Sequence, residues 1–156
     1  MRLRLIAVGR LRAGPERELV DDWLARAGRG GRALGFGPIE EIEIDERRHR
    51  TPAAQAEAIR AALPAGAALC VLDERGRTLS SPEFAARLAG WRDAGRPAAA
   101  LVIGGADGLT PELRAQADLV LSFGPMVWPH MLARAMLAEQ LYRAVTILAG
   151  TPYHRG

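Results

Sequence analysis

Apolar and polar residues follow two patterns along this chain, and the patterns divide it into short and long segments. The short segments are either continuously apolar or alternate apolar with polar residues, and both patterns predict β-strands. A continuous apolar run such as 98–103 is typical of a strand buried on both faces of a mainly parallel sheet. The predicted strands are residues 2–8, 38–44, 67–72, 98–103 and 119–122.

The longer segments repeat apolar residues at helical spacing and begin with residues that favour helix starts. Pro15 suits a first turn, Thr51 is placed to cap a helix, and Ser80 with Glu83 has capping-box spacing. The predicted helices are residues 15–27, 52–63, 81–94, 110–117 and 130–148. Because strands and helices alternate throughout, we expect a single α/β domain over residues 1–156, with a mainly parallel sheet flanked by helices.

The first and last helices carry more specific predictions. Leu19, Trp23 and Ala27 lie at helical spacing and are expected to face the core, and the glycines from residue 28 onward indicate a mobile basic loop over 28–37. The last helix is apolar on more than one side, which is more surface than a small domain can bury. We therefore expect part of this helix to contact a second subunit.

Composition excludes several kinds of chemistry. All 21 basic residues are arginine, so lysine-dependent phosphate loops, Schiff-base enzymes and lysine general bases are ruled out. The single cysteine, Cys70, lies inside an apolar run and is expected to be a buried, inert thiol. The first residues fit neither a signal peptide nor a membrane span, so a cytoplasmic protein with no membrane association is expected.

The charge of the chain points mildly towards a polyanion such as nucleic acid. The net charge is +3, and the stretch 45–50 contains Arg47, Arg48, His49 and Arg50 in succession. This stretch is either a solvated loop or a segment that contacts phosphates without reading sequence. No second histidine or cysteine lies near His49 at ligand spacing, so no metal site is expected.

Three predicted strands end in turns that could surround a ligand. Leu72-Asp73, Gly104-Gly105 and the loop 124–129 each follow a strand, and the carboxyl ends of parallel strands meet at one edge of a sheet. An apolar-walled pocket is expected there, although a tight turn without a ligand also explains a double glycine. The dinucleotide fingerprint is not met after any strand, which argues against a Rossmann oxidoreductase.

The residues of the C-terminal half resemble a known family. The resemblance is carried by Ile-Gly-Gly-Ala-Asp-Gly-Leu at 103–109, Pro129-His130, Glu-Gln-Leu-Tyr-Arg-Ala at 139–144, and Pro-Tyr-His-Arg at 152–155. These motifs are similar to those of the small SPOUT methyltransferases of the ribosomal RNA large subunit methyltransferase H family. The similarity extends over essentially the whole chain.

This resemblance implies a fold with a deep trefoil knot, a homodimer, and S-adenosylmethionine bound in the knotted region, about residues 67–156. It places the cofactor against residues that follow three of the predicted strands. By similarity these cofactor-binding residues are Leu72, Gly104, Gly105, Gly124, Pro125, Met126, Val127, Trp128 and Pro129.

The implied reaction is methylation of N3 of a pseudouridine in 23S rRNA of the assembled ribosome. Arg143, His154 and Arg155 are expected to contact the base or its phosphates, Tyr153 to order the tail, and His130 to position the base or its proton. A frayed terminus is the alternative interpretation of the tail residues, and a helix cap is the alternative for His130. Gly124, Val127 and Trp128 depart from the usual family loop.

Two other functions are compatible with these observations. A non-catalytic ribosome-binding or assembly factor would use the basic surface but leaves the paired glycine turns unexplained. A related SPOUT methyltransferase acting on transfer RNA is disfavoured by the short chain and its Pro-Tyr-His-Arg ending.

Overall fold

The computed structural model describes residues 1–156 and contains one five-stranded sheet with the order β2-β1-β4-β3-β5, all strands parallel. The predicted fold class is therefore confirmed. The strands are β1 (Arg2–Val8), β2 (Ile39–Ile44), β3 (Ala68–Thr78), β4 (Ala98–Ile103) and β5 (Leu119–Ser122). The helices are α1 (Pro15–Gly31), a 3-10 turn (Arg32–Leu34), α2 (Pro52–Ala62), α3 (Ser81–Asp93), α4 (Pro111–Gln116) and α5 (His130–Ala149).

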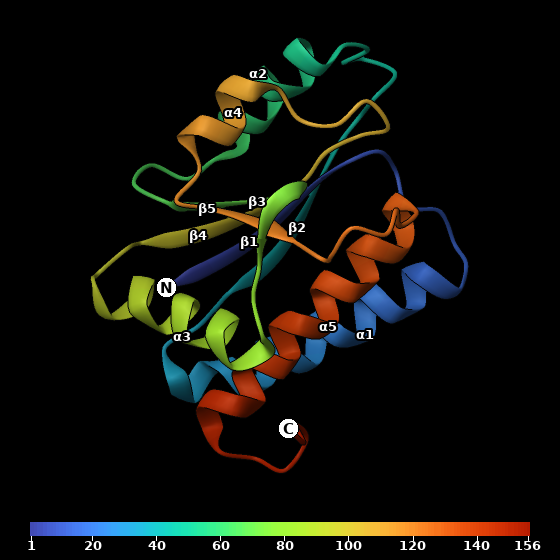
Figure 1. Ribbon diagram of the computed structural model, residues 1–156. Helices are drawn as coiled ribbons and strands as arrows, with labels where there is room; N and C mark the ends of the chain where they lie inside the picture. Colours follow the sequence, from blue (N-terminus) through green and yellow to red (C-terminus); the bar gives the residue numbers. More distant parts are fainter.

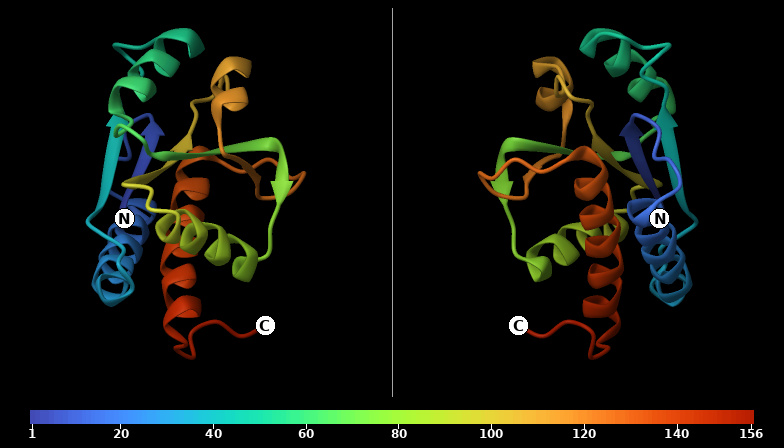
Figure 2. Two further views of the ribbon diagram at one scale, coloured as in Figure 1. Left: turned by 90° about the vertical axis from the view of Figure 1, so that its left-hand side faces the viewer. Right: turned by 90° about the vertical axis from the view of Figure 1, so that its right-hand side faces the viewer.

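The sheet separates two helical layers, as Figure 1 and Figure 2 show. Helices α1, α3 and α5 cover one face, and α2 and α4 cover the other. All six residues of β4 are buried because this central strand has helices on both faces, which explains its uninterrupted apolar sequence. None of the helices is long and apolar enough to span a membrane.

The predicted helix starts are confirmed. The Thr51 hydroxyl accepts a hydrogen bond from the Ala54 amide at 3.1 Å. Ser80 and Glu83 form a reciprocal capping box, in which the Ser80 hydroxyl accepts from the Glu83 amide at 3.3 Å and the Glu83 carboxylate accepts from the Ser80 amide at 2.7 Å. These caps satisfy amide groups that the first helical turn leaves without partners.

The prediction of a mobile loop over 28–37 was wrong for residues 28–34, which are helical. Helix α1 continues to Gly31, the 3-10 turn follows, and Gly35 ends the segment in the left-handed region. The reason is packing: a Cβ on Gly30 would lie 2.9 Å from Val145 of α5, and one on Gly31 would lie 3.1 Å from Phe36. These glycines allow α1 and α5 to approach closely, so here they do not end a helix.

The predicted buried stripe of α1 was also partly wrong. Leu19 is 44% exposed and Trp23 is half-buried, whereas the buried residues of α1 are Val20, Ala27 and Gly31. The face that packs against the core is therefore rotated from the expected one.

Strand β3 is longer than predicted. Residues 73–77, expected as a turn, form an irregular continuation in which both Leu72 and Arg77 lie opposite Leu121 of β5. Gly76 crosses β5 so closely that a Cβ there would lie 2.5 Å from the Val120 carbonyl oxygen. Residues 73–76 have no partner in the register, and pairing with β5 resumes at Arg77 and Thr78. A sequence pattern cannot show such an irregularity.

A buried ion-pair network joins α5 to strand β2. Arg134 is 3% exposed and donates to the carboxylates of Glu41 at 3.1 Å and Glu43 at 2.6 Å, and to the Gly9 carbonyl at 3.0 Å. Arg17 of α1 pairs with Glu41 as well. Burial opposes ionisation of Glu43, but the Leu11 amide and Arg134 outweigh it and lower the pKa of this carboxyl. The network ties the first half of α5 to the edge of the sheet.

We predict that Arg134→Met lowers the free energy of unfolding by about 3 kcal/mol, because two partly buried carboxylates lose their shared partner. The measurement is urea denaturation. The matched control is Arg26→Met, whose pair with Asp22 is exposed at both ends and is expected to contribute about 0–1 kcal/mol. Equal decreases in the free energy of unfolding in the two variants would contradict a larger stabilising contribution from the buried network.

Candidate active site

A cavity of about 330 Å³ lies at the carboxyl edge of the sheet, where β4 and β5 end and β3 becomes irregular after Leu72. We call it the edge cavity. Its walls come from three chain segments that are distant in sequence and from the start of α5. The lining residues are 72–75, 103–109, 123, 124, 126–128, 130 and 133.

The glycine turn after β4 forms one wall of the edge cavity. A Cβ on Gly104 would lie 2.9 Å from the Leu109 side chain, and one on Gly105 would lie 3.1 Å from Val8. The turn closes through a hydrogen bond from the Gly108 amide to the Gly105 carbonyl at 3.0 Å. Because side chains are excluded, main-chain groups form this part of the wall, as a site that binds a ligand through its backbone requires.

The carboxylate of Asp73 stabilises a second wall of the edge cavity, formed by residues 72–75. The Asp73 side chain is 7% exposed and accepts a hydrogen bond from the Arg75 amide at 2.9 Å. Arg114 of α4 lies 3.5 Å from the Asp73 carboxylate and donates to the Leu109 carbonyl at 2.7 Å. Arg114 thereby holds the segment after Leu72 and the end of the glycine turn in one arrangement.

The outer wall is the apolar loop between β5 and α5. Met126 is 71% exposed, Val127 is 88% exposed and Trp128 is 38% exposed. The loop is anchored at its start, where the Ser122 hydroxyl accepts from the Gly124 amide at 3.0 Å. Exposed apolar side chains of this size mark a surface that a ligand or partner covers.

Most of the expected cofactor-binding residues meet at the edge cavity. Leu72, Gly104, Gly105, Gly124, Met126, Val127 and Trp128 line it, as does His130, whereas Pro125 and Pro129 do not. Sequence reasoning omitted Phe123, which lines both this cavity and the next.

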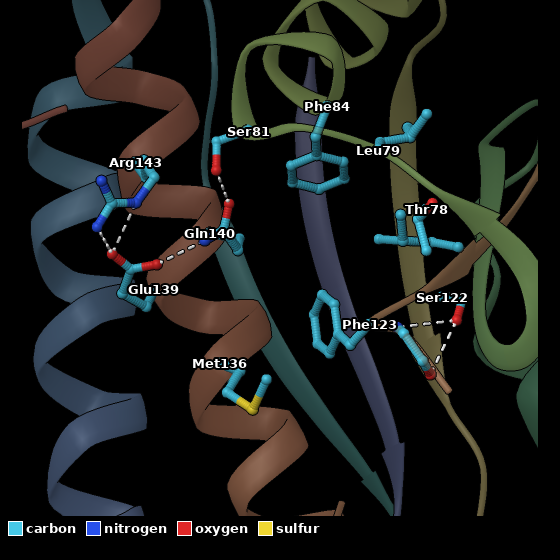
Figure 3. A pocket seen from close by; sticks show the side chains of 12 residues that line it. Thr78, Leu79, Ser81, Phe84, Ser122, Phe123, Met136, Glu139, Gln140 and Arg143 are labelled. Carbon is cyan, nitrogen blue, oxygen red and sulfur yellow. Dashed lines mark hydrogen bonds and ion pairs between the residues drawn. The ribbon is translucent and has the colours of Figure 1, made fainter. Parts of the chain in front are cut away.

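A second cavity of about 580 Å³ adjoins the first and is shown in Figure 3. We call it the helix-side cavity because α3 and α5 form two of its walls. Phe123 and Gly124 lie between the two cavities. The other lining residues are Thr78, Leu79, Ser81, Phe84, Leu121, Ser122, Met136, Glu139, Gln140 and Arg143.

Glu139 connects the helix-side cavity to the C-terminal tail. Its Oε1 atom accepts from Arg143 Nη2 at 2.6 Å and from the Tyr153 hydroxyl at 2.8 Å. Arg143 Nη1 lies 3.3 Å from His154 Nδ1. The hydrogen bond that Arg143 donates to Glu139 raises the pKa of Arg143, and burial together with Glu139 raises the pKa of Tyr153. Three residues expected to be catalytic therefore form one cluster around a carboxylate.

Aromatic contacts hold this tail against α1 and α5. The Tyr153 ring centroid lies 4.8 Å from that of Tyr142 and 6.0 Å from that of Trp23. The Arg143 guanidinium lies 4.7 Å from the centre of the Tyr153 ring. The tail is thus packed up to His154 and is not a frayed terminus, whereas Arg155 is exposed.

The five residues expected to be catalytic fall into two groups within one chain. His130 begins α5 at the edge cavity, and Arg143 lies 13 residues later on the same helix, which corresponds to about 20 Å at 1.5 Å per residue. Figure 1 shows the C-terminus at the far end of α5. Glu139, at the centre of the second group, was missed, although its spacing of four residues from Arg143 is a recognisable signal.

The structure confirms that the Cys70 thiol is buried. It is buried in β3, and burial raises the pKa of its thiol to about 12, so the reactive thiolate form is suppressed at neutral pH.

A parallel α/β sheet with a main-chain-lined cavity at its carboxyl edge is the arrangement in which α/β domains typically bind small ligands. The comparisons with known proteins identify which family of such domains this is. The chain belongs to the SPOUT methyltransferases, since the model described as predicted SPOUT methyltransferase matches residues 1–154.

Close relatives share one name. The chain is 64% identical to ribosomal RNA large subunit methyltransferase H of Ruegeria pomeroyi and 65% identical to the protein of that name from Cereibacter sphaeroides, each over 99% of both chains. Among solved structures, a probable methylase family protein from Haemophilus influenzae matches with a TM-score of 0.47 and 15% identity, over 99% of this chain and 70% of that chain. This last likeness is too distant to carry an argument about the site.

We predict that Glu139→Gln loosens the tail, because the acceptor loses its negative charge and the hydrogen bonds that it accepts from Arg143 and Tyr153 become weaker. The measurement is the backbone order parameter of Tyr153 by nuclear magnetic resonance, expected to fall from about 0.85 to below about 0.6. Glu112→Gln, an exposed carboxylate in the first turn of α4, is the control and is expected to leave the tail unchanged. If the tail is equally ordered in both variants, the aromatic contacts are sufficient to order it and Glu139 is not required.

Proposed function

We propose that this protein is an S-adenosylmethionine-dependent methyltransferase of large-subunit ribosomal RNA, and that the edge cavity binds the cofactor. The observation that carries the proposal is the main-chain wall at Gly104 and Gly105, where packing leaves no room for side chains. The cavity volume of about 330 Å³ lies within the range of ligand sites. The names of the close relatives support the ribosomal RNA substrate.

The residues around the edge cavity suit this cofactor. Leu72, Gly104, Gly105 and the loop 124–129 would hold it, with backbone groups for its polar edges and apolar side chains for its flat ring. The bound cofactor supplies an electrophilic methyl group on a sulfonium. The protein has to hold the accepting nitrogen in line with that group.

The target atom that the family resemblance implies is N3 of a pseudouridine in 23S rRNA of the assembled ribosome. This nitrogen loses its proton before or during transfer, and the two adjoining carbonyl oxygens gain negative charge. Arginine side chains stabilise that charge by hydrogen bonds that strengthen as it develops. In this proposal Arg143, His154 and Arg155 supply such donors, Tyr153 orders them, and His130 positions the base. A cytoplasmic location and the trefoil knot belong to the same proposal.

The two groups of residues expected to be catalytic lie at different positions along α5. In one chain about 20 Å of helix separates His130 from Arg143, and Arg143 lines the helix-side cavity, which does not include His130. We therefore propose a homodimer in which α5 of each chain runs antiparallel to the other, so that each tail lies beside the partner's cavity. The exposed Met131 and Leu132, at 47% and 37%, give α5 an apolar surface for this contact.

The first test is methyl transfer from radiolabelled S-adenosylmethionine to 70S ribosomes that lack the modification. We expect the wild-type protein to label 23S rRNA at N3 of one pseudouridine and to bind the cofactor with micromolar affinity, about −8 kcal/mol. Gly105→Leu is expected to abolish both, because its side chain displaces the glycine turn. Gly90→Leu, on the exposed face of α3 with no atom near its Cβ, is the control. Cofactor affinity unchanged by Gly105→Leu would remove the edge cavity from the proposal.

A second test separates sites within one chain from sites shared by two chains. Gly105→Leu and Arg155→Ala are each expected to be strongly impaired alone, and Arg155→Ala to keep its stability because the side chain is exposed. In an equimolar mixture half of the dimers are mixed, and each mixed dimer has one intact site if the tail acts on its partner. Activity should then return to about one quarter of the wild-type level. No recovery beyond the parent variants would mean that each tail serves its own chain.

A further inference from the structure

We propose that residues 9–14 and 45–50, the loops that follow β1 and β2, form a surface that binds RNA backbone phosphates beside the edge cavity. We call it the basic edge. This inference rests on the proposed function, since it names the part of the protein that receives the ribosomal RNA. It assigns the contacts to Arg10, Arg12, Arg47 and Arg50.

These arginines differ from most others because no carboxylate holds them. Twelve of the 21 arginines have a carboxylate oxygen within 4.0 Å. Four of the remaining nine lie on the basic edge, and all four are exposed. The only ionic contact within the basic edge joins Arg48 to Asp45 at 3.8 Å, and both side chains are more than half exposed, so it contributes little. No carboxylate competes for these four guanidinium groups. Arg50 donates from Nε to the Arg47 carbonyl at 3.2 Å, which leaves its two terminal nitrogens available to bind a ligand.

The net charge of the molecule is concentrated on this surface. The two loops contain five arginines and two carboxylates, Asp45 and Glu46, which gives a net charge of +3. The whole chain also has a net charge of +3, so the rest of the protein is neutral overall. A long-range field towards a polyanion must originate mainly from the basic edge.

The two loops lie side by side because their strands are parallel neighbours in the sheet. The Gly9 amide donates to the Ile44 carbonyl at 2.9 Å, which joins the start of one loop to the start of the other. A Cβ on Gly9 would lie 3.8 Å from the Glu46 carboxylate. In Figure 1 both loops lie at the same edge of the sheet as the loop that leads into α5.

A single side chain connects the basic edge to the edge cavity. Gln55, which is 8% exposed, donates from Nε2 to the His49 carbonyl at 3.0 Å. Its Oε1 atom lies 3.3 Å from the Cβ position of Gly105, a residue of the cavity wall. RNA phosphates on the 45–50 loop would thus be one side chain away from the glycine turn at which we place the cofactor.

The chemistry of the basic edge favours phosphates over bases. A guanidinium presents a planar set of donors that matches two phosphate oxygens. Neither loop contains Phe, Tyr or Trp, and His49, the one ring on which a base could stack, is partly buried. The basic edge would therefore position an RNA strand without reading its sequence, and recognition of the target base would be left to the residues at the cavity.

The test is the salt dependence of binding to 70S ribosomes that lack the modification, measured by co-sedimentation at several KCl concentrations. For the double variant Arg47→Gln with Arg50→Gln, we expect the slope of log affinity against log salt to fall by about 1.5, since each lost phosphate contact removes about 0.7. The KM for ribosomes should rise in proportion. The turnover number, the affinity for S-adenosylmethionine and the melting temperature should stay unchanged.

The matched control is Arg29→Gln with Arg32→Gln, which removes two exposed, unpaired arginines far from the edge cavity and changes the net charge equally. If the slope of log affinity against log salt falls equally in both double variants, or in neither, the proposal that the basic edge binds RNA phosphates is wrong. Absence of methylation by the wild-type protein, with the slope still altered only by Arg47 and Arg50, would defeat the proposed reaction and leave the RNA surface supported.

Discussion

The arrangement of all five strands in parallel is the constraint on which the rest of this structure depends. A chain that leaves a parallel strand must cross a face of the sheet before it can begin the next one, so helices cover both faces and the central strands are apolar. The same constraint brings every strand end to one edge. The glycine turn, the apolar loop before α5 and the two basic loops all occupy that edge, although they are spread over more than 120 residues.

Helix α5 distributes the functional residues along its length. Its first residue lies at the edge cavity, Arg134 ties its first half to β2 through buried ion pairs, and Glu139 and Arg143 hold the tail further along. A straight helix of this length keeps its ends far apart. The dimer proposed above would bring the tail of one chain to the edge cavity of the other across this distance.

Arginine serves three different physical roles in a chain without lysine. Arg134 is buried and pairs with two carboxylates, and Arg143 is partly buried between Glu139 and Tyr153. Arg47 and Arg50 are exposed and have no carboxylate partner. The difference lies in the environment of each side chain, because the same guanidinium stabilises a fold when it is paired and is available to bind phosphates when it is not.

The sequence by itself determined the fold class, the buried strand at 98–103, the helix caps at Thr51 and Ser80, and the glycine turns that line the edge cavity. Each of these depends on local pattern or on which residue types a turn tolerates. Only the tertiary structure decided that Gly30 and Gly31 pack against α5, that residues 73–77 continue β3, and that Arg134 pairs with carboxylates more than 90 residues away. Those outcomes arise from contacts between distant segments, and a chain read in order contains no local signal of which segments will meet.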